Sequence, residues 1–203
     1  MRYIARGVCM ARPQEFEYDQ VLNSAMQLFW RKGYASTSIK DLTEVTKLQP
    51  GSLYGTFKNK RSLFLQSLDF YFLNLYTSIK KILHSKKAPL ERIYDFFDYF
   101  ITQAESDIDR KSCLLVNTLL EIPAEDEKIN ILVREMFHKI ENEFSIVLSE
   151  AKDKGNLKKG TDTDALAKML MSGIFGLQVY NKMQPDKQGL KKIIQSLLST
   201  LKN

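Results

Sequence analysis

Residues 33–60 of this chain read GYASTSIKDLTEVTKLQPGSLYGTFKNK, and this stretch decides the fold. It predicts two short helices joined by a tight turn. The first begins after Ser38, because Ser38 and Asp41 stand three residues apart as in a capping box; Thr37 is the competing N-cap. The second begins at Pro50, whose missing N–H costs nothing at a first helical position. With a longer helix before them, the pair indicates a helix-turn-helix.

The apolar residues of the two short helices define the faces that pack inward. Ile39, Leu42 and Val45 share one side of the first, and Leu53 and Phe57 share one side of the second. The second also contains two glycines, each of which disfavours a helix by roughly 1 kcal/mol relative to alanine. We therefore expect this helix to form only when it is packed against its neighbours.

Longer helices flank the pair. Acidic residues lead a helix expected over residues 15–32, basic residues end it, and Gly33 follows as its C′ residue. Asn59 can cap a long helix that ends near His84. No alternating pattern of convincing length indicates a strand, so the fold class is all-α. Further helices are expected over residues 90–102 and 113–121, from Pro123, over 162–183, and from Pro185.

The net charge of +6 is unevenly distributed along the chain. Residues 1–61 carry ten Lys and Arg against five Asp and Glu, whereas the remaining residues carry 20 against 19. A basic segment joined to a near-neutral one suggests a polyanionic partner, although a solvated basic surface without a partner stays open. We expect a mobile arm over residues 1–12, a helix-turn-helix domain over 13–60, and a larger helical domain over 61–203.

Composition argues against several classes of protein. The two cysteines, Cys9 and Cys113, make neither a disulfide framework nor a zinc site, and neither histidine has a companion at ligand spacing, so we expect no metal and no cofactor. No apolar run approaches the roughly 18 residues that span a bilayer, and the N-terminus lacks the apolar segment of a secretory signal. We therefore expect a cytoplasmic protein that does not contact a membrane. The sequence shows no nucleophile–base pair or phosphate-binding glycine loop, which argues against an enzyme.

Two runs in the first third resemble a known family. Residues 25–42, AMQLFWRKGYASTSIKDL, and residues 51–60, GSLYGTFKNK, are similar to the N-terminal region of tetracycline-repressor (TetR) type transcriptional regulators. The match covers roughly residues 13 to 65. The resemblance implies a homodimer that binds a palindromic double-stranded DNA operator through residues 13–60. It also implies that residues 61–203 bind a small-molecule effector and form the dimer, with the effector releasing a repressor from the operator.

The resemblance further implies which residues contact DNA. The helix that begins at Pro50 would enter the major groove, which is about 12 Å wide and accepts one helix. Gly51 would let this helix approach closely. Thr37, Tyr54 and Lys60 fall at phosphate-contacting positions, and the positions that touch bases or the groove wall are Gln49, Pro50, Ser52, Gly55 and Thr56.

Each phosphate-contacting candidate also has a structural interpretation. Tyr54 can cover the domain core with its ring, Thr37 can serve only as a helix cap, and Lys60 can point into water. The chain also departs from the family, which often has Lys where Pro50 stands and a larger residue where Gly55 stands. Few long side chains of this helix therefore reach base edges.

The effector site is expected in the second half of the chain. Residues 112–118, SCLLVNT, resemble the ligand domain of one TetR subgroup, which commonly has glycine where Ser112 stands. Cys113 is either a small buried hydrophobe or a thiol that faces the effector and reacts with electrophiles or oxidants. The aromatic residues of the helix expected over residues 90–102 either pack in the domain core or line the pocket. The candidate pocket residues are Phe97, Phe100, Cys113, Asn117, Glu121, Met136 and Phe175.

The helix over residues 162–183 is apolar nearly all round and must be buried on two sides. By resemblance, it and the last helix pair with their copies in a four-helix bundle. The alternative is the central helix of a monomer. The candidate interface residues are Leu166, Leu170, Gly173, Leu177, Ile194, Leu197 and Leu201. For the whole protein, the alternative function is a helical small-molecule sensor or carrier that acts through a protein partner.

Overall fold

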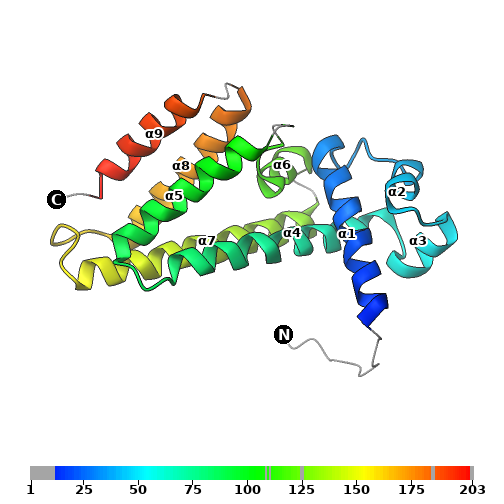
Figure 1. Cartoon of the computed structure of the whole chain (residues 1–203), viewed down its shortest axis with the longest axis horizontal. Helices are drawn as coiled ribbons and strands as arrows, with labels where there is room; N and C mark the ends of the chain where they lie inside the picture. Colours follow the sequence, from blue (N-terminus) through cyan, green and yellow to red (C-terminus); the bar gives the residue numbers. More distant parts are fainter. Residues whose placement is uncertain (1–11, 108, 110, 124–125, 184–185, 202–203) are drawn as a thin grey trace. The chain divides into compact units, whose positions relative to one another are not determined.

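A computed structural model describes residues 12–107, 109, 111–123, 126–183 and 186–201, and these residues contain helices and no strand. The expected arm over residues 1–12 lies outside them except for Arg12, where the first helix begins. None of the described helices is both long enough and apolar enough to cross a membrane. The helices are α1 (Arg12–Lys32), α2 (Ile39–Thr46), α3 (Pro50–Phe57), α4 (Lys60–Leu83), α5 (Pro89–Ser106), α6 (Leu114–Glu121), α7 (Glu127–Asp153), α8 (Thr163–Met183) and α9 (Lys187–Ser199) (Figure 1).

The chain forms two compact units, one ending at Phe70 and the other beginning at Tyr71. The division lies inside α4, further along the chain than the boundary expected at residue 60. Leu63, Phe64 and Leu68 of α4 are buried, and they belong to the core of the first unit. The start of α4 therefore completes the helix-turn-helix unit.

The core of the first unit contains aromatic rings from three helices, α1, α3 and α4, and from the loop after α1. Phe64 meets Phe29 edge-on, with ring centroids 5.0 Å apart, and lies 4.6 Å from the ring of Tyr34. Phe57 at the end of α3 stacks on Tyr18 of α1 at 5.4 Å. Burial of these rings supplies the packing energy that the short helices α2 and α3 lack on their own.

Local caps fix the ends of the first helices, as the sequence predicted. Gly33 has a φ of +83°, and its N–H donates to the carbonyl of Phe29 at 2.9 Å, which ends α1. Ser38 and Asp41 form the reciprocal capping box that starts α2. The side chain of Asn59 accepts from the N–H of Ser62 at 2.8 Å and so caps α4.

Two helix starts in the second unit differ in detail from the prediction. Pro123 does not begin α7, because Asp126 is the N-cap and its carboxylate accepts from the N–H of Ile129 at 3.4 Å. The last helix was expected from Pro185, which lies outside the described residues. That helix, α9, begins after its N-cap Asp186.

The second unit packs α5 against α7 and α9, and α8 against α7 and α9, while α6 lies on α7 (Figure 1). Buried polar side chains of α5 and α7 contact the second half of α4 and the residue that follows it. Arg92 of α5 donates to the carbonyl of Leu83 at 2.9 Å and pairs with Glu150 of α7. Glu143 of α7 accepts from the hydroxyl of Tyr76 and lies 2.5 Å from Nε2 of His84. The end of α4 is thus held by charge-assisted contacts with α5 and α7.

Candidate nucleic-acid interface

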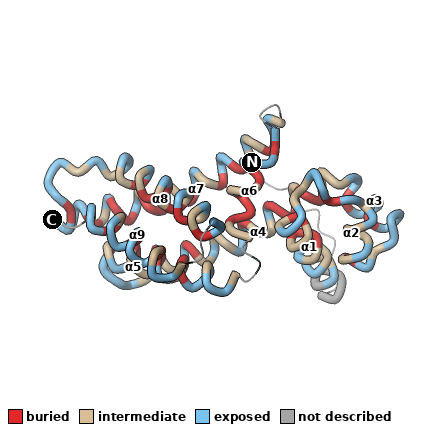
Figure 2. Tube along the Cα trace, turned by 90° about the horizontal axis from the view of Figure 1, so that it is seen from above, coloured by how far each residue is buried: buried red, intermediate tan, exposed pale blue. Residues whose placement is uncertain are grey.

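Helix α3 presents one narrow buried side and a broad exposed side. Leu53 and Phe57 are its only buried residues, and both are almost completely enclosed. Figure 2 shows the rest of α3 as exposed. The exposed side, together with the N-cap, carries seven of the residues expected to contact DNA, namely Gln49, Pro50, Gly51, Ser52, Tyr54, Gly55 and Thr56.

The chemistry of this exposed side suits a DNA groove. Gln49 precedes α3 as its N-cap, but its side chain makes no capping hydrogen bond, so the amide is not used to start the helix. An amide of this kind can bond an adenine edge through two hydrogen bonds. Ser52 and Thr56 offer short hydroxyl donors, and Tyr54, 44% exposed, presents a phenol.

The two glycines of α3 are not explained by packing within the chain. A β-carbon added at Gly51 or Gly55 would meet no atom within 4 Å, and neither glycine has the positive φ that favours this residue. Glycine inside a helix is unfavourable by roughly 1 kcal/mol relative to alanine. The two glycines of α3 therefore lower stability, and no contact among the described residues offsets this cost.

We expect Gly55→Ala to raise the free energy of unfolding by about 0.5–1 kcal/mol, which corresponds to a rise of roughly 1–4 °C in Tm. Thermal unfolding followed by circular dichroism measures this change. The matched control is Gly173→Ala, because a β-carbon there would lie 2.5 Å from Cδ2 of Leu197, so the end of that side chain must move and the rise in Tm should be smaller. A lower Tm for Gly55→Ala would show that packing or backbone conformation requires glycine at this position.

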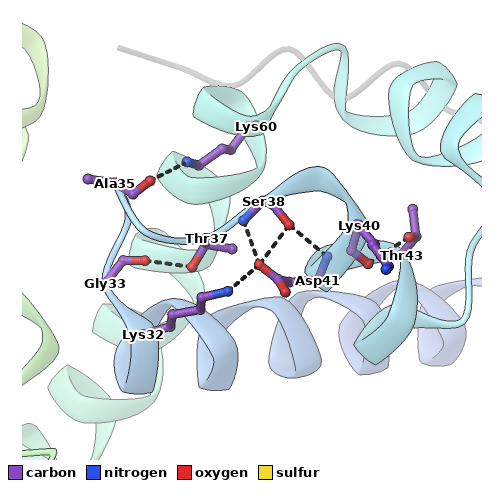
Figure 3. Close-up of polar contacts among 9 residues, drawn as sticks. All are labelled: Lys32, Gly33, Ala35, Thr37, Ser38, Lys40, Asp41, Thr43 and Lys60. Atoms are coloured by element: carbon purple, nitrogen blue, oxygen red, sulfur yellow. Dashed lines mark hydrogen bonds and ion pairs between the residues drawn. The ribbon is translucent and has the colours of Figure 1, made fainter.

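Lys60 lies at the first position of α4, beside the loop between α1 and α2. Its ammonium is 3.4 Å from the carbonyl of Ala35 (Figure 3). It also lies 4.5 Å from the centroid of the Tyr34 ring. The cation–π contact orients the side chain, and an ammonium carries three donors. The arrangement is compatible with a phosphate contact from Lys60.

Thr37 does not have the surroundings expected of a phosphate-binding residue. Its side chain is 1% exposed, and its hydroxyl donates its single proton to the carbonyl of Gly33 at 2.5 Å (Figure 3). Ser38, not Thr37, caps α2. The hydroxyl of Thr37 instead closes the loop between α1 and α2. Thr37 is therefore not among the proposed DNA contacts.

The start of α2 is also tied to α1 by charge. The carboxylate of Asp41 lies 2.5 Å from the ammonium of Lys32 and accepts from both the N–H and the hydroxyl of Ser38 at 2.7 Å (Figure 3). The Lys32 ammonium and then the Ser38 donors hold the pKa of Asp41 well below its ordinary value. Asp41 therefore stays ionised at neutral pH, which preserves the capping box that orients α2 relative to α1.

The residues expected in an effector pocket lie in the second unit, on several helices. Phe97 and Phe100 of α5 and Met136 of α7 are buried, and Phe175 of α8 meets the ring of Phe137 edge-on at 4.9 Å. In the α6 segment, Asn117 donates to the carbonyl of Lys111 at 2.6 Å, while Glu121 is exposed at the end of the helix. The amide of Asn117 therefore helps to hold the loop before α6.

Cys113 is buried as the N-cap residue of α6. Its Sγ lies 3.6 Å from the hydroxyl of Tyr71, a residue that sequence reasoning did not select. Burial raises the pKa of Cys113, which disfavours the reactive thiolate at neutral pH. These surroundings favour a small buried hydrophobe over an exposed reactive thiol. Among the described residues, no group of three His, Cys, Asp or Glu side chains is arranged to hold a metal ion.

Most residues expected at a dimer interface are used inside one protomer. Leu170, Leu177, Ile194 and Leu201 are buried within the second unit. Gly173 lies against the side chain of Leu197, so both serve the contact between α8 and α9. Leu166 is partly exposed. The exposed apolar residues of the same two helices, which the sequence analysis did not choose, are Val179, Met183 and Ile193.

Comparison with known proteins places both units in one family. Residues 21–66 match the family model described as "Bacterial regulatory proteins, tetR family". Residues 89–197 match the model described as "Tetracyclin repressor-like, C-terminal domain". The second match alone covers more than half of the chain.

Relatives along nearly the whole chain agree with these matches. The uncharacterized HTH-type transcriptional regulator YezE of Bacillus subtilis (strain 168) is 28% identical over 193 residues, which cover 95% of this chain and 100% of YezE. The HTH-type transcriptional repressor ComR of Escherichia coli (strain K12) is 26% identical over 192 residues, covering 94% of this chain and 90% of ComR.

Solved structures show the same fold. A cysteine-substituted form of the TetR family regulator CifR, solved with 26-bp operator DNA, superimposes with a TM-score of 0.81 at 25% identity, covering 96% of this chain and 98% of that one. A TetR regulator from Chloroflexus aurantiacus gives a TM-score of 0.84 over 93% of this chain and 96% of its own. From its two family matches, its relatives and its helix-turn-helix geometry, the chain belongs to the TetR family of DNA-binding transcriptional regulators.

Proposed function

We propose that this protein is a homodimeric repressor that binds a palindromic operator and is released from it by a small-molecule effector. The observation that carries the proposal is the exposed side of α3, where seven expected DNA-contacting residues lie together while Leu53 and Phe57 anchor the helix. The repressor ComR and the CifR complex with operator DNA support the same function. Such a regulator acts in the cytoplasm, where bacterial DNA lies.

In the bound state, the N-terminal end of α3 enters the major groove. Gln49 reads a base edge, and Ser52 and Thr56 make short hydrogen bonds or touch a thymine methyl group. Tyr54 and Lys60 donate to phosphates, which fixes the position of the helix but carries no sequence information. A two-fold dimer holds two such helices about 34–36 Å apart, so that they meet successive major grooves of a palindrome.

Release requires an effector that binds two arrangements of the second unit with different affinity. Helix α4 belongs to both units, and the proposed signal from the effector is a shift of its second half that passes along this helix to the first unit. Arg92 and Glu143 hold this half of α4 to α5 and α7. The proposed effector site lies among the helices that bear Phe97, Phe100, Cys113, Asn117, Glu121, Met136 and Phe175.

Selection of bound sequences from a random duplex library, followed by fluorescence anisotropy, tests the proposal. We expect a two-fold symmetric consensus and binding at nanomolar to micromolar protein that weakens steeply with salt. A scrambled duplex of equal length is the control. If no sequence is enriched and neither duplex binds, the repressor proposal fails, and the sensor that acts through a protein partner replaces it. The enzyme interpretation is excluded by membership of a family of DNA-binding regulators.

We expect Tyr54→Phe to weaken operator binding about 5- to 150-fold, because each protomer loses one hydrogen bond worth roughly 0.5–1.5 kcal/mol and the dimer has two copies. The measurement is the Kd for the selected duplex. Tm should not change, since the Tyr54 side chain is 44% exposed. Tyr99→Phe in the second unit serves as the matched control. An unchanged Kd for Tyr54→Phe would show that its hydroxyl faces water in the complex.

A further inference from the structure

Two lysines flank α3 at positions where the backbone favours glycine. Lys47, the C-cap of α2, has φ +60° and ψ +15°, which is the left-handed region. Lys58, directly after α3, has φ +66° and ψ −49°. Only one other non-glycine residue in the described part of the chain, Ser112, has a positive φ. Lysine at both ends of the same short helix is therefore unusual in backbone terms.

The conformation of Lys58 is the more demanding of the two. The N–H of Asn59 donates to the carbonyl of Phe57 at 2.8 Å, so Lys58 is the central residue of a three-residue turn. With a positive φ and a negative ψ, this is the rarer and more strained form of that turn. Glycine at either lysine position would relieve the crowding of the β-carbon.

No contact among the described residues explains why lysine stands at either position. Both side chains are exposed, and neither ammonium forms a hydrogen bond, an ion pair or a ring contact with a described residue. A strained backbone that persists without a local benefit is commonly found at functional sites. Lys47 is the C-cap of α2, shortly before α3 begins, and Lys58 directly follows α3, so a positively charged residue stands before and after the helix whose exposed side bears Gln49, Ser52 and Tyr54.

We propose that Lys47 and Lys58 bind phosphates of the DNA backbone on either side of the groove that α3 enters. This inference rests on the proposed function and adds two contacts to it. Each lysine neutralises one phosphate per protomer, and release of the condensed cations contributes to affinity. Because α3 has few long side chains for base edges, backbone contacts at its ends position it in the groove.

The test compares stability and operator affinity in Lys47→Gly and Lys58→Gly. We expect each variant to raise Tm by about 2–4 °C, because the strained backbone is relieved. We also expect each to weaken binding to the selected duplex roughly tenfold. The slope of log K against log salt should fall in magnitude by about 2, because the dimer loses two phosphate contacts. Lys47→Arg, which keeps both the charge and the backbone strain, should retain the wild-type affinity.

Lys128→Gln in α7 is the charge-matched control and should leave affinity and salt slope unchanged. If Lys47 only complements the dipole of α2, Lys47→Gly will lower Tm and leave the salt slope unchanged, which would overturn the proposal. Equal Kd values and slopes for wild type and both glycine variants would also overturn it. Failure of the wild type to bind any duplex would instead reject the repressor function itself.

Discussion

Val179→Glu is expected to convert the proposed dimer into a monomer and to weaken operator binding about 10²- to 10⁴-fold. Val179 and Met183 lie on α8 with side chains 45% and 77% exposed, although α8 is otherwise one of the most apolar helices of the chain. Val179 and Met183 are one helical turn apart, so they form a contiguous exposed apolar patch of the kind that marks an interaction surface. A carboxylate placed there would be buried without a partner in the dimer, which strongly disfavours association.

The loss of affinity follows from the symmetry of the operator. When two α3 helices are joined by a dimer, the second binds at a high effective concentration, an advantage of about 10²- to 10⁴-fold that a monomer lacks. Light scattering gives the mass in solution, and anisotropy gives the Kd. Gly176 supports the placement of the dimer interface on this side of α8. It is exposed, and a β-carbon there would meet no described atom within 4 Å.

Ile146→Glu is the matched control for this change. Ile146 is an exposed apolar residue of α7, 47% accessible, so the same substitution is made away from α8 and α9. We expect it to leave the dimer and the Kd intact. A dimer that survives Val179→Glu with unchanged affinity would move the interface away from the exposed side of α8.

Phe57→Ala is expected to lower the free energy of unfolding by about 3–5 kcal/mol and to abolish operator binding at 37 °C. Phe57 is 1% exposed and stacks on Tyr18, so it makes no contact with DNA itself. It is one of the two buried residues of α3. The eight residues of α3 include two glycines, so this helix does not persist once its packing is lost.

Thermal unfolding measures the change in stability, and anisotropy at a temperature below the transition separates loss of folding from loss of contact. Phe57→Leu is the control, since a volume-conserving apolar change in a core costs less than about 1.5 kcal/mol. We expect Phe57→Leu to retain operator binding. If Phe57→Ala binds with the wild-type Kd at low temperature, α3 is held by something other than its two buried residues.

Features built from neighbours a few residues apart could be predicted from the sequence. Gly33, the Ser38–Asp41 capping box and Asn59 each fix a helix end through bonds that span three or four residues. The buried side of α3 follows from the four-residue spacing of Leu53 and Phe57 in the same way. These local rules, with the matching runs around them, sufficed for the all-α class and the exposed side of α3.

Only the tertiary structure decided features that depend on distant partners. The resemblance predicts a phosphate contact for Thr37, whereas the structure shows a buried hydroxyl that donates to the carbonyl of Gly33. The pairing of Tyr71 with Cys113 and of Tyr76 with Glu143 joins residues 42 and 67 positions apart, and no spacing in the sequence indicates either.

Dependence on distant partners also explains why the sequence did not identify the exposed residues of α8 and α9. Helical periodicity shows that α8 and α9 are apolar on several sides. It does not show which side of each helix is covered by other helices of the same protomer. Packing of Gly173 against Leu197 assigns that side to the protomer and leaves Val179, Met183 and Ile193 exposed. Sequence thus determines which residues form a helix face, whereas contact between helices determines what that face meets.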